Sequence, residues 1–90
     1  MKYVINLVDY EEKYADAINE IRIDEWGRDC AIDIRKKITK NSHIKVAKQN
    51  DLVVGFGSGK IIGDAFYIDS IVIKKEFRNK SIGSMLLNYF

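Results

Sequence analysis

The fold is decided by Phe66-Tyr-Ile-Asp-Ser-Ile-Val-Ile-Lys-Lys-Glu-Phe-Arg-Asn-Lys-Ser-Ile-Gly-Ser-Met-Leu-Leu-Asn-Tyr-Phe90. Residues 68–73 are mostly apolar and β-branched, which predicts a buried strand. Residues 74–80 form a short polar and basic loop. Apolar residues then return at helical spacing, which predicts a helix that starts near residue 82. These residues are Ile82, Met85, Leu86, Tyr89 and Phe90.

This order of strand, loop and helix suits a bound phosphate. The first turn of a helix presents backbone N–H groups without partners in the helix, and the helix dipole favours negative charge there. Gly83 allows the backbone to approach a ligand closely, and Ser81 can cap the helix. The alternative is a purely structural strand–turn–helix unit with a solvated basic loop, and the residue pattern alone leaves both open.

The six residues Arg78-Asn-Lys-Ser-Ile-Gly83 resemble the acetyl-CoA motif of the GNAT superfamily of N-acetyltransferases. That motif is usually written Gln/Arg-x-x-Gly-x-Gly/Ala and follows a strand by four residues. Arg78 and Gly83 match it, whereas Ser81 stands where the first glycine is usual, and the preceding loop lacks the frequent proline. The position between an Ile-rich strand and a Leu-rich helix makes the resemblance more specific than six residues alone.

The resemblance implies an acetyl-CoA site with two parts and no metal. Backbone groups of the strand would pair with the pantetheine arm as an extra strand does, and backbone N–H groups of the loop and helix start would hold the pyrophosphate. Arg78 and Lys80 would add positive charge. The strand residues are Ile71, Val72 and Ile73, and the phosphate-binding residues are Arg78, Asn79, Lys80, Ser81, Ile82, Gly83 and Ser84.

Six elements are predicted before the helix near residue 82, including the strand described above. Residues 3–8 predict a strand, and Asp9 with Glu12 forms a capping box for an amphipathic helix over residues 10–22. Residues 24–27 break this helix, and a second helix follows over residues 29–39, with Cys30 facing inward. Alternating apolar residues predict a strand over residues 42–49, and two further strands are predicted over residues 52–62 and 65–73. Three glycines weaken the strand over 52–62 and suggest a bulge or a close neighbour there. Asn50-Asp51 and Gly63-Asp64 are the turns that join these strands.

The expected fold class is therefore α/β, with an α+β mixed sheet, in the order β-α-α-β-β-β-α. This order resembles the first half of the GNAT-like acyl-CoA N-acyltransferase fold, and residues 1–90 would form one partial domain of it. That fold normally continues with one further helix and three strands, roughly 50–60 residues by ordinary element lengths. The resemblance thus implies a truncated domain that lacks the usual C-terminal part.

The composition predicts a globular cytoplasmic protein. Hydrophobic residues make up 47% and charged residues 31% of the 90 residues, which excludes a disordered chain. No apolar run approaches the roughly 18 residues of a membrane span, and the N-terminus does not resemble a signal peptide. The single Cys30 excludes an internal disulfide and fits a reducing compartment. His43 has no second ligand at metal spacing, so no metal site is expected.

The catalytic residues are less clearly marked than the acetyl-CoA motif. Many relatives use a carboxylate on or near the fourth strand to deprotonate the amine, which by resemblance indicates Asp69, with Tyr67 two residues away on the same face. The alternative for Asp69 is a strand-end acid paired with a lysine. Glu25 and Trp26 lie where the family contacts its acceptor, and they could attract and cover a cationic amine. Their alternative is a polar turn with one core aromatic.

Three functions are compatible with the sequence. The first is transfer of an acetyl group from acetyl-CoA to a primary amine, or the acetyl-CoA-binding half of such an enzyme. The second is a non-catalytic GNAT-like module that forms a homodimer, or a strand-exchanged oligomer, through the exposed edge of its fourth strand. The third is nucleic-acid binding through the basic residues at 74–80, although a net charge of +2 is too small to indicate it.

Overall fold

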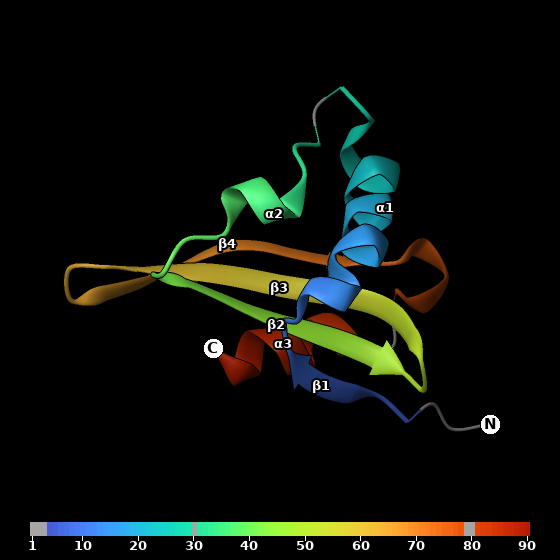
Figure 1. Cartoon of the computed structure of the whole chain (residues 1–90). Coiled ribbons are helices and arrows are strands. Elements are labelled where there is room, and N and C mark those ends of the chain that lie inside the picture. The colour runs from blue at the N-terminus through green and yellow to red at the C-terminus, as the bar shows by residue number, and fades with distance from the viewer. Residues whose placement is uncertain (1–3, 30, 79–80) are drawn as a thin grey trace.

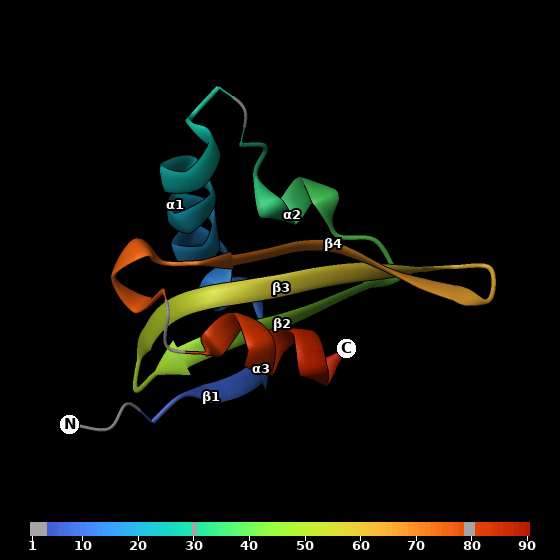
Figure 2. The ribbon, with the colours of Figure 1, turned by 180° about the vertical axis from the view of Figure 1, so that it is seen from behind.

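The computed structural model describes residues 4–29, 31–78 and 81–90, which form one antiparallel sheet with helices on both of its faces. The strands lie in their sequence order, β1-β2-β3-β4. Helices α1 and α2 cover one face, and α3 lies on the other (Figures 1 and 2). The elements are β1 (Asn6–Asp9), α1 (Ala15–Trp26), α2 (Ile34–Lys37), β2 (Ser42–Gln49), β3 (Leu52–Ile62), β4 (Ala65–Ile73) and α3 (Ile82–Tyr89), with 3-10 turns at Glu12–Tyr14 and Lys75–Phe77.

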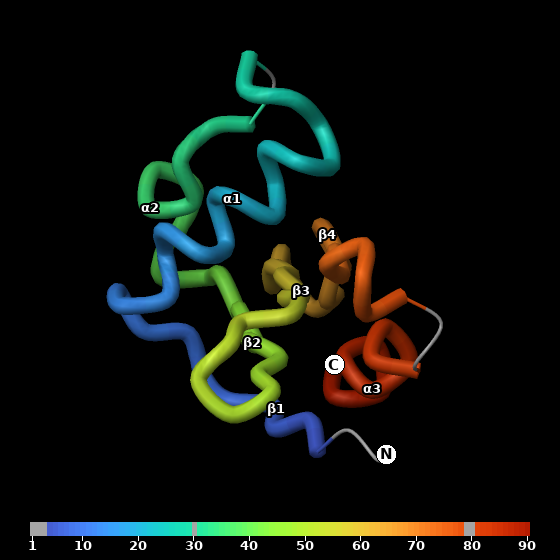
Figure 3. The backbone as a smooth tube through the Cα atoms, turned by 90° about the vertical axis from the view of Figure 1, so that its right-hand side faces the viewer, coloured from blue at the N-terminus to red at the C-terminus, as the bar shows by residue number. Residues whose placement is uncertain are grey.

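The core has two layers, one on each side of the sheet. The end-on view in Figure 3 places α1 and α2 on one side of the strands and α3 on the other. Alternate residues of a strand point to opposite faces, so neighbouring residues such as Val53 and Val54 enter different layers. The α1 layer contains Tyr14, Ala15, Ile18, Ile21, Ile34, Val46, Val53, Phe56 and Val72, and the α3 layer contains Ala47, Val54, Ile82 and Leu86.

The predicted strands over residues 42–49, 52–62 and 65–73 are confirmed with the same bounds. Their turns use left-handed backbone conformations at Asn50 and Gly63. The glycines of β3 bring side chains against the strand backbone. A Cβ on Gly59 would lie 2.4 Å from Cζ of Phe66, and a Cβ on Gly57 would lie 2.8 Å from Cε2 of Phe90. The expected close neighbours of these glycines are therefore present.

The start of the chain differs from the prediction. Asp9 is the last residue of β1, and its carboxylate pairs with the buried Lys45 of β2 and not with a helix N-terminus. The predicted capping box is therefore wrong, and a 3-10 turn precedes α1, which begins at Ala15. The helix also continues through the predicted break to Trp26 and ends at Gly27, whose φ of 84° favours glycine.

The predicted second helix is shorter than expected. Among the described residues of this segment, only residues 34–37 are helical, and Asp33 caps them by accepting a hydrogen bond from the backbone N–H of Arg35 (3.0 Å). Asn19 of α1 fixes this start, because its Nδ2 donates to Asp33 (2.9 Å) and its Oδ1 accepts from the N–H of Ile34 (2.8 Å). Contacts between α1 and the segment after it thus replace the regular helix that the apolar spacing predicted. Cys30 lies outside the described residues.

Candidate functional site

The C-terminal half of β4 forms one edge of the sheet. Ile71, Val72 and Ile73 pair with Gly57, Phe56 and Gly55 of β3 on one side, and no strand among residues 4–29, 31–78 and 81–90 pairs with their other side. Their side chains are used for packing, since Val72 belongs to the α1 layer and the two isoleucines pack against the α3 layer. The backbone at this edge is consequently available for pairing while the side chains hold the strand in place.

The chain leaves this edge through a turn and enters α3. The backbone N–H of Lys74 donates to the carbonyl oxygen of Val54 (2.7 Å), which fixes the start of the loop against the sheet. Ser81 precedes α3 with φ of 65°, and its side chain makes no capping hydrogen bond. The capping role predicted for Ser81 is therefore absent, and a serine occupies a left-handed conformation that glycine adopts more readily.

A groove of about 290 Å³ opens at the N-terminus of α3. Among the described residues, and apart from its chain neighbours and the backbone of its own helix, no heavy atom lies within 4 Å of a Cβ placed on Gly83, so the space in front of this glycine is open to them. The structure brings together most of the predicted acetyl-CoA residues in this groove, whereas Asn79 and Lys80 lie outside the described residues. The groove is lined by Ile73, Phe77, Arg78, Ser81, Ile82, Gly83 and Ser84.

Arg78 connects this groove to the end of α1. Its Nε donates to the carbonyl oxygen of Ile73 (3.3 Å), and its Nη2 forms an ion pair with the carboxylate of Glu25. Glu25 lies in the last turn of α1 and not in the predicted interhelix loop. Glu25, which was predicted to bind the acceptor, thus contacts Arg78, which was predicted to bind the pyrophosphate.

A second groove, of about 350 Å³, lies between the end of α1 and the loop after β4. It shares Ile73 and Arg78 with the first groove, so the two hollows adjoin at these two residues. Its charged lining residues are the acids Asp24, Glu25 and Glu76 and the bases Lys74, Lys75 and Arg78.

Asp69 lies at an irregularity of β4. The register shifts between Ser58 and Gly59, so that Ser58 pairs with Ser70, Gly59 pairs with Ile68, and Asp69 is the extra residue of a β-bulge. Asp69 lines a small cavity of about 20 Å³ that shares no residue with the groove at α3. Tyr67 is 55% exposed and pairs with Lys60, which lines the same small cavity. The structure therefore separates the predicted acid–base pair from the motif groove.

Arg22 is a residue of this region that the sequence analysis missed. Its side chain is buried in the same cavity as Asp69, and its Nη1 donates to the carbonyl oxygen of Ile32. Burial lowers the pKa of Arg22, and the negative charges of Asp33 and Asp69 partly oppose this shift. Arg22 follows Ile18 by four residues, so its position on the apolar stripe of α1 was a signal that could have identified it.

Trp26 lies beside Arg22 and not in a core position. The guanidinium carbon of Arg22 is 5.5 Å from the centroid of the Trp26 ring, a cation–π distance. The tryptophan is 39% exposed, and one side of the ring is already occupied by this cation. The core-aromatic alternative for Trp26 thus does not describe its environment.

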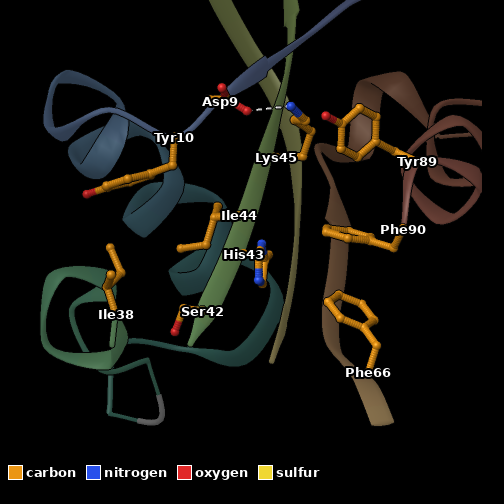
Figure 4. A pocket seen from close by; sticks show the side chains of 10 residues that line it. All are labelled: Asp9, Tyr10, Ile38, Ser42, His43, Ile44, Lys45, Phe66, Tyr89 and Phe90. Atoms are coloured by element: carbon orange, nitrogen blue, oxygen red, sulfur yellow. Dashed lines mark hydrogen bonds and ion pairs between the residues drawn. The ribbon is translucent and has the colours of Figure 1, made fainter. Parts of the chain in front are cut away.

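A larger hollow than these two grooves lies at the other end of α3 (Figure 4). Its volume is about 500 Å³, and it surrounds the first residues of β2, where β1 no longer pairs with that strand. The rings of Phe66 and Phe90 stack on its α3 side at 5.4 Å between centroids, and His43 faces Phe66. None of the predicted site residues lines this hollow.

Two further kinds of feature are absent from the part of the chain that the structure describes. No helix there is long and apolar enough to cross a membrane. No cluster of three His, Cys, Asp or Glu side chains there could hold a metal ion.

Comparison with solved structures identifies the fold. An aminoglycoside 6'-N-acetyltransferase complexed with coenzyme A superimposes with a TM-score of 0.81 at 18% identity, over 93% of this chain and 52% of that protein. The PaiA N-acetyltransferase of Thermoplasma acidophilum, in complex with coenzyme A, gives 0.77 at 17% identity, over 96% of this chain and 69% of that protein. The ribosomal-protein-S18-alanine N-acetyltransferase of Escherichia coli gives 0.76 at 12% identity, over 96% and 56%.

The chain thus spans about half of the length of the first of these proteins. No curated protein sequence matches it. A family profile described as the acetyltransferase (GNAT) family matches residues 7–90. The expected fold is confirmed by these structures, and because the profile covers nearly the whole sequence, the chain belongs to the acetyltransferase (GNAT) family.

Proposed function

We propose that this chain binds acetyl-CoA and forms the donor-binding half of an N-acetyltransferase that acts on a primary amine. The observation that carries the proposal is the groove of about 290 Å³ at the N-terminus of α3, beside the unpaired edge of β4. A strand edge and a helix N-terminus are both suited to a ligand with an amide-containing arm and a pyrophosphate. Two of the similar proteins are complexes with coenzyme A.

The two parts of the ligand would use different groups of the protein. The pantetheine arm would pair with the free backbone edge at Ile71, Val72 and Ile73, because the side chains of these residues are held in the two core layers. The pyrophosphate would accept hydrogen bonds from the first backbone N–H groups of α3. Arg78 would contribute positive charge.

The acid–base chemistry is proposed with Asp69 as the base. Its position at a β-bulge supports the role, because bulges redirect side chains and are common next to active sites. Removal of a proton from the ammonium group of the acceptor would leave the amine free to attack the thioester carbonyl, with release of the CoA thiol. Tyr67 would be the partner that returns a proton to the leaving thiolate. Glu25 and Trp26 would contact the acceptor.

Titration with acetyl-CoA by calorimetry tests the donor site. We expect the wild-type protein to bind and the Gly83→Glu variant to lose binding, because a glutamate there fills the open space and repels the phosphates. Asn88→Glu is the matched control, since it adds the same charge to the exposed last turn of α3. Equal binding by the wild type and the Gly83→Glu variant would contradict the proposed site.

Ser81→Gly refines this test. The left-handed conformation of Ser81 costs a non-glycine residue about 1 kcal/mol. Glycine should therefore raise the free energy of unfolding by up to about 1 kcal/mol, less the loss from the greater freedom of the unfolded chain. Acetyl-CoA affinity that stays equal or improves would show that the serine hydroxyl is not a required phosphate ligand, whereas a loss would assign it that role.

A non-catalytic assembly through β4 is the second candidate function. The β3–β4 hairpin extends beyond the rest of the molecule (Figures 1 and 2) and exposes large apolar side chains next to an unpaired edge. Such an edge can pair with a second copy of the chain. We therefore propose a homodimer or strand-exchanged oligomer, in the reducing cytoplasm. The exposed residues are Ile61, Ile62, Phe66, Tyr67 and Ile68.

Sedimentation velocity tests this assembly. The wild type should sediment as a dimer or larger species at micromolar concentration, and Ile68→Lys, which places a charge on the edge strand, should shift it toward monomer. Ile32→Lys is the control, because Ile32 is exposed in the loop before α2. A monomeric wild type at these concentrations would exclude the proposed dimer.

A further inference from the structure

The two adjoining grooves meet at a single ion pair. Arg78 lines both grooves, and its guanidinium pairs with Glu25, which lines only the groove beside α1. Its Nε separately donates to the carbonyl oxygen of Ile73, so the stem of the arginine stays at the end of β4 whichever partner its outer nitrogens have. The residue placed to contact a phosphate is therefore also the partner of a carboxylate that faces the other groove.

These two uses of Arg78 oppose each other. The carboxylate and a pyrophosphate both accept hydrogen bonds from the outer nitrogens of the guanidinium, and both form strong charge-assisted pairs with arginine. The pyrophosphate carries two negative charges and the carboxylate one, so the pyrophosphate attracts the guanidinium more strongly. The side chains of Arg78 and Glu25 are 47% and 39% exposed, so the pair that must be broken is a weak one. A weak pair that spans 53 residues of sequence can be exchanged by a ligand without disturbing the fold.

We propose that donor binding releases Glu25 to recognise a cationic acceptor. The pyrophosphate would take the guanidinium of Arg78, and the freed carboxylate would then face the groove of about 350 Å³. There the three acids Asp24, Glu25 and Glu76 would outnumber the two remaining bases, Lys74 and Lys75. The donor would accordingly bind first, and the acceptor would be an alkylammonium and not a neutral or acidic amine. This inference rests on the proposed function, because it needs the pyrophosphate to reach Arg78.

Asp24→Asn is the matched control for this proposal. Asp24 lines the same groove as its neighbour Glu25, and it forms no ion pair among the residues that the structure describes. Neutralising either acid removes one negative charge near the phosphates, but only Glu25→Gln releases the guanidinium. A general effect of charge would therefore raise the CoA affinity of both variants, whereas competition for Arg78 would raise that of Glu25→Gln only.

The first experiment is calorimetric titration of CoA into the wild type, Glu25→Gln and Asp24→Asn. Glu25→Gln should bind CoA about two- to five-fold more tightly than the wild type, the range that corresponds to a partly exposed ion pair. In an Arg78→Gln background the same substitution should have no effect. Equal affinities of the wild type and Glu25→Gln, or an equal gain in Asp24→Asn, would overturn the proposal while leaving CoA binding intact.

The second experiment measures the acceptor side with butylammonium as the probe, followed by NMR. Saturation with CoA should tighten butylammonium binding to the wild type, because coupling between two sites is reciprocal. The expected factor is about equal to the gain in CoA affinity that Glu25→Gln shows over the wild type. Glu25→Gln should lose this gain, and Asp24→Asn should keep it. If Glu25→Gln binds CoA and the wild type does not, competition between Glu25 and the pyrophosphate for Arg78 is still supported. Absence of CoA binding in the wild type and in every variant would overturn the proposed function together with this inference.

Discussion

The face of the sheet under α1 and α2 and the face under α3 are held together differently. Among the described residues, nine buried residues form the layer below α1, and a set of charged and amide side chains around Asn19, Asp33 and Arg35 joins its two helices. The layer below α3 has four buried residues. Glycines of β3 complete it, since Phe66 and Phe90 lie directly on the strand backbone there.

This difference shows which changes each face tolerates. Few side chains hold α3, so its position, and with it the groove in front of Gly83, depends on the volume of individual residues. The α1 face combines a larger apolar layer with polar contacts, and it should respond to charge and pH as well as to volume. Substitutions on the two faces can therefore separate the two kinds of stabilisation.

The largest effect is expected for Leu86→Ala on the α3 face. Leu86 is fully buried, and its loss should lower the free energy of unfolding by about 2–5 kcal/mol, through the lost burial and the cavity that remains. Leu87→Ala is the control, because Leu87 is 51% exposed and its truncation should have little effect. Urea denaturation followed by circular dichroism measures both, and similar losses in the two variants would contradict the assigned orientation of α3.

On the α1 face, Arg22→Met should cost about 1.5–3 kcal/mol, as expected for a hydrogen bond from a charged group. The substitution keeps the apolar stem but leaves the carbonyl oxygen of Ile32 without its donor and removes the contact with Trp26. Arg35→Met is the comparison. Although Arg35 contacts three carboxylates, they lie at the surface, so its loss should cost less than about 1 kcal/mol.

Substitution of the β3 glycines should have intermediate to small effects. A Cβ on Gly59 would lie 2.9 Å from the carbonyl oxygen of Tyr67, a backbone atom, so Gly59→Ala should destabilise the protein by about 1–3 kcal/mol. The nearest atom to a Cβ on Gly57 belongs to the ring of Phe90, a side chain that can move aside more easily than a backbone atom. Thermal unfolding should consequently show a smaller loss for Gly57→Ala, and the reverse order would contradict this account of β3.

The smallest effect is a pH dependence of the α1 face. Hydrogen bonds from Asn19 and from the backbone N–H of Arg35 lower the pKa of Asp33 below its unfolded value of about 3.8. The stabilisation from Asp33 is therefore complete above that pH and is lost as the pH falls through the lower pKa of the folded state.

Asp33→Asn measures this contribution, because the asparagine amide replaces the titrating carboxyl group with one that does not titrate. Its free energy of unfolding, followed by urea denaturation between pH 7 and pH 2.5, should differ most from that of the wild type above pH 5, and the difference should shrink below about pH 4. Asp51→Asn is the matched control, because it removes one carboxylate at an exposed turn. A difference that is constant with pH would exclude Asp33 as a titrating contributor.

Most of the sheet could be predicted from the sequence, because its signals are local. Alternating residues and the turns at Asn50 and Gly63 gave β2, β3 and β4 with the observed bounds. The segment before β2 could not be predicted in the same way. Asp9 forms an ion pair with Lys45, Asn19 donates a hydrogen bond to Asp33, and both contacts join residues that are distant in sequence.

The candidate site shows the same division. The groove residues 78 and 81–84 belong to one strand–loop–helix pattern of the sequence, so a motif could identify them. The pairing of Glu25 with Arg78 depends on how α1 crosses the end of β4, and no local pattern contains that information. Arg22 is an exception, because a charged residue four positions after Ile18 was visible on the apolar stripe of α1.

The sequential order of the strands has a consequence for how the chain folds. The β2–β3 and β3–β4 hairpins close through turns of two residues each, so a three-stranded meander can form from local contacts within microseconds to milliseconds. Pairing of β1 with β2 must instead close a loop of about thirty residues that includes both α1 and α2. The meander, with the left-handed turns at Asn50 and Gly63, is therefore the expected nucleus, and the two helical layers would assemble on it afterwards.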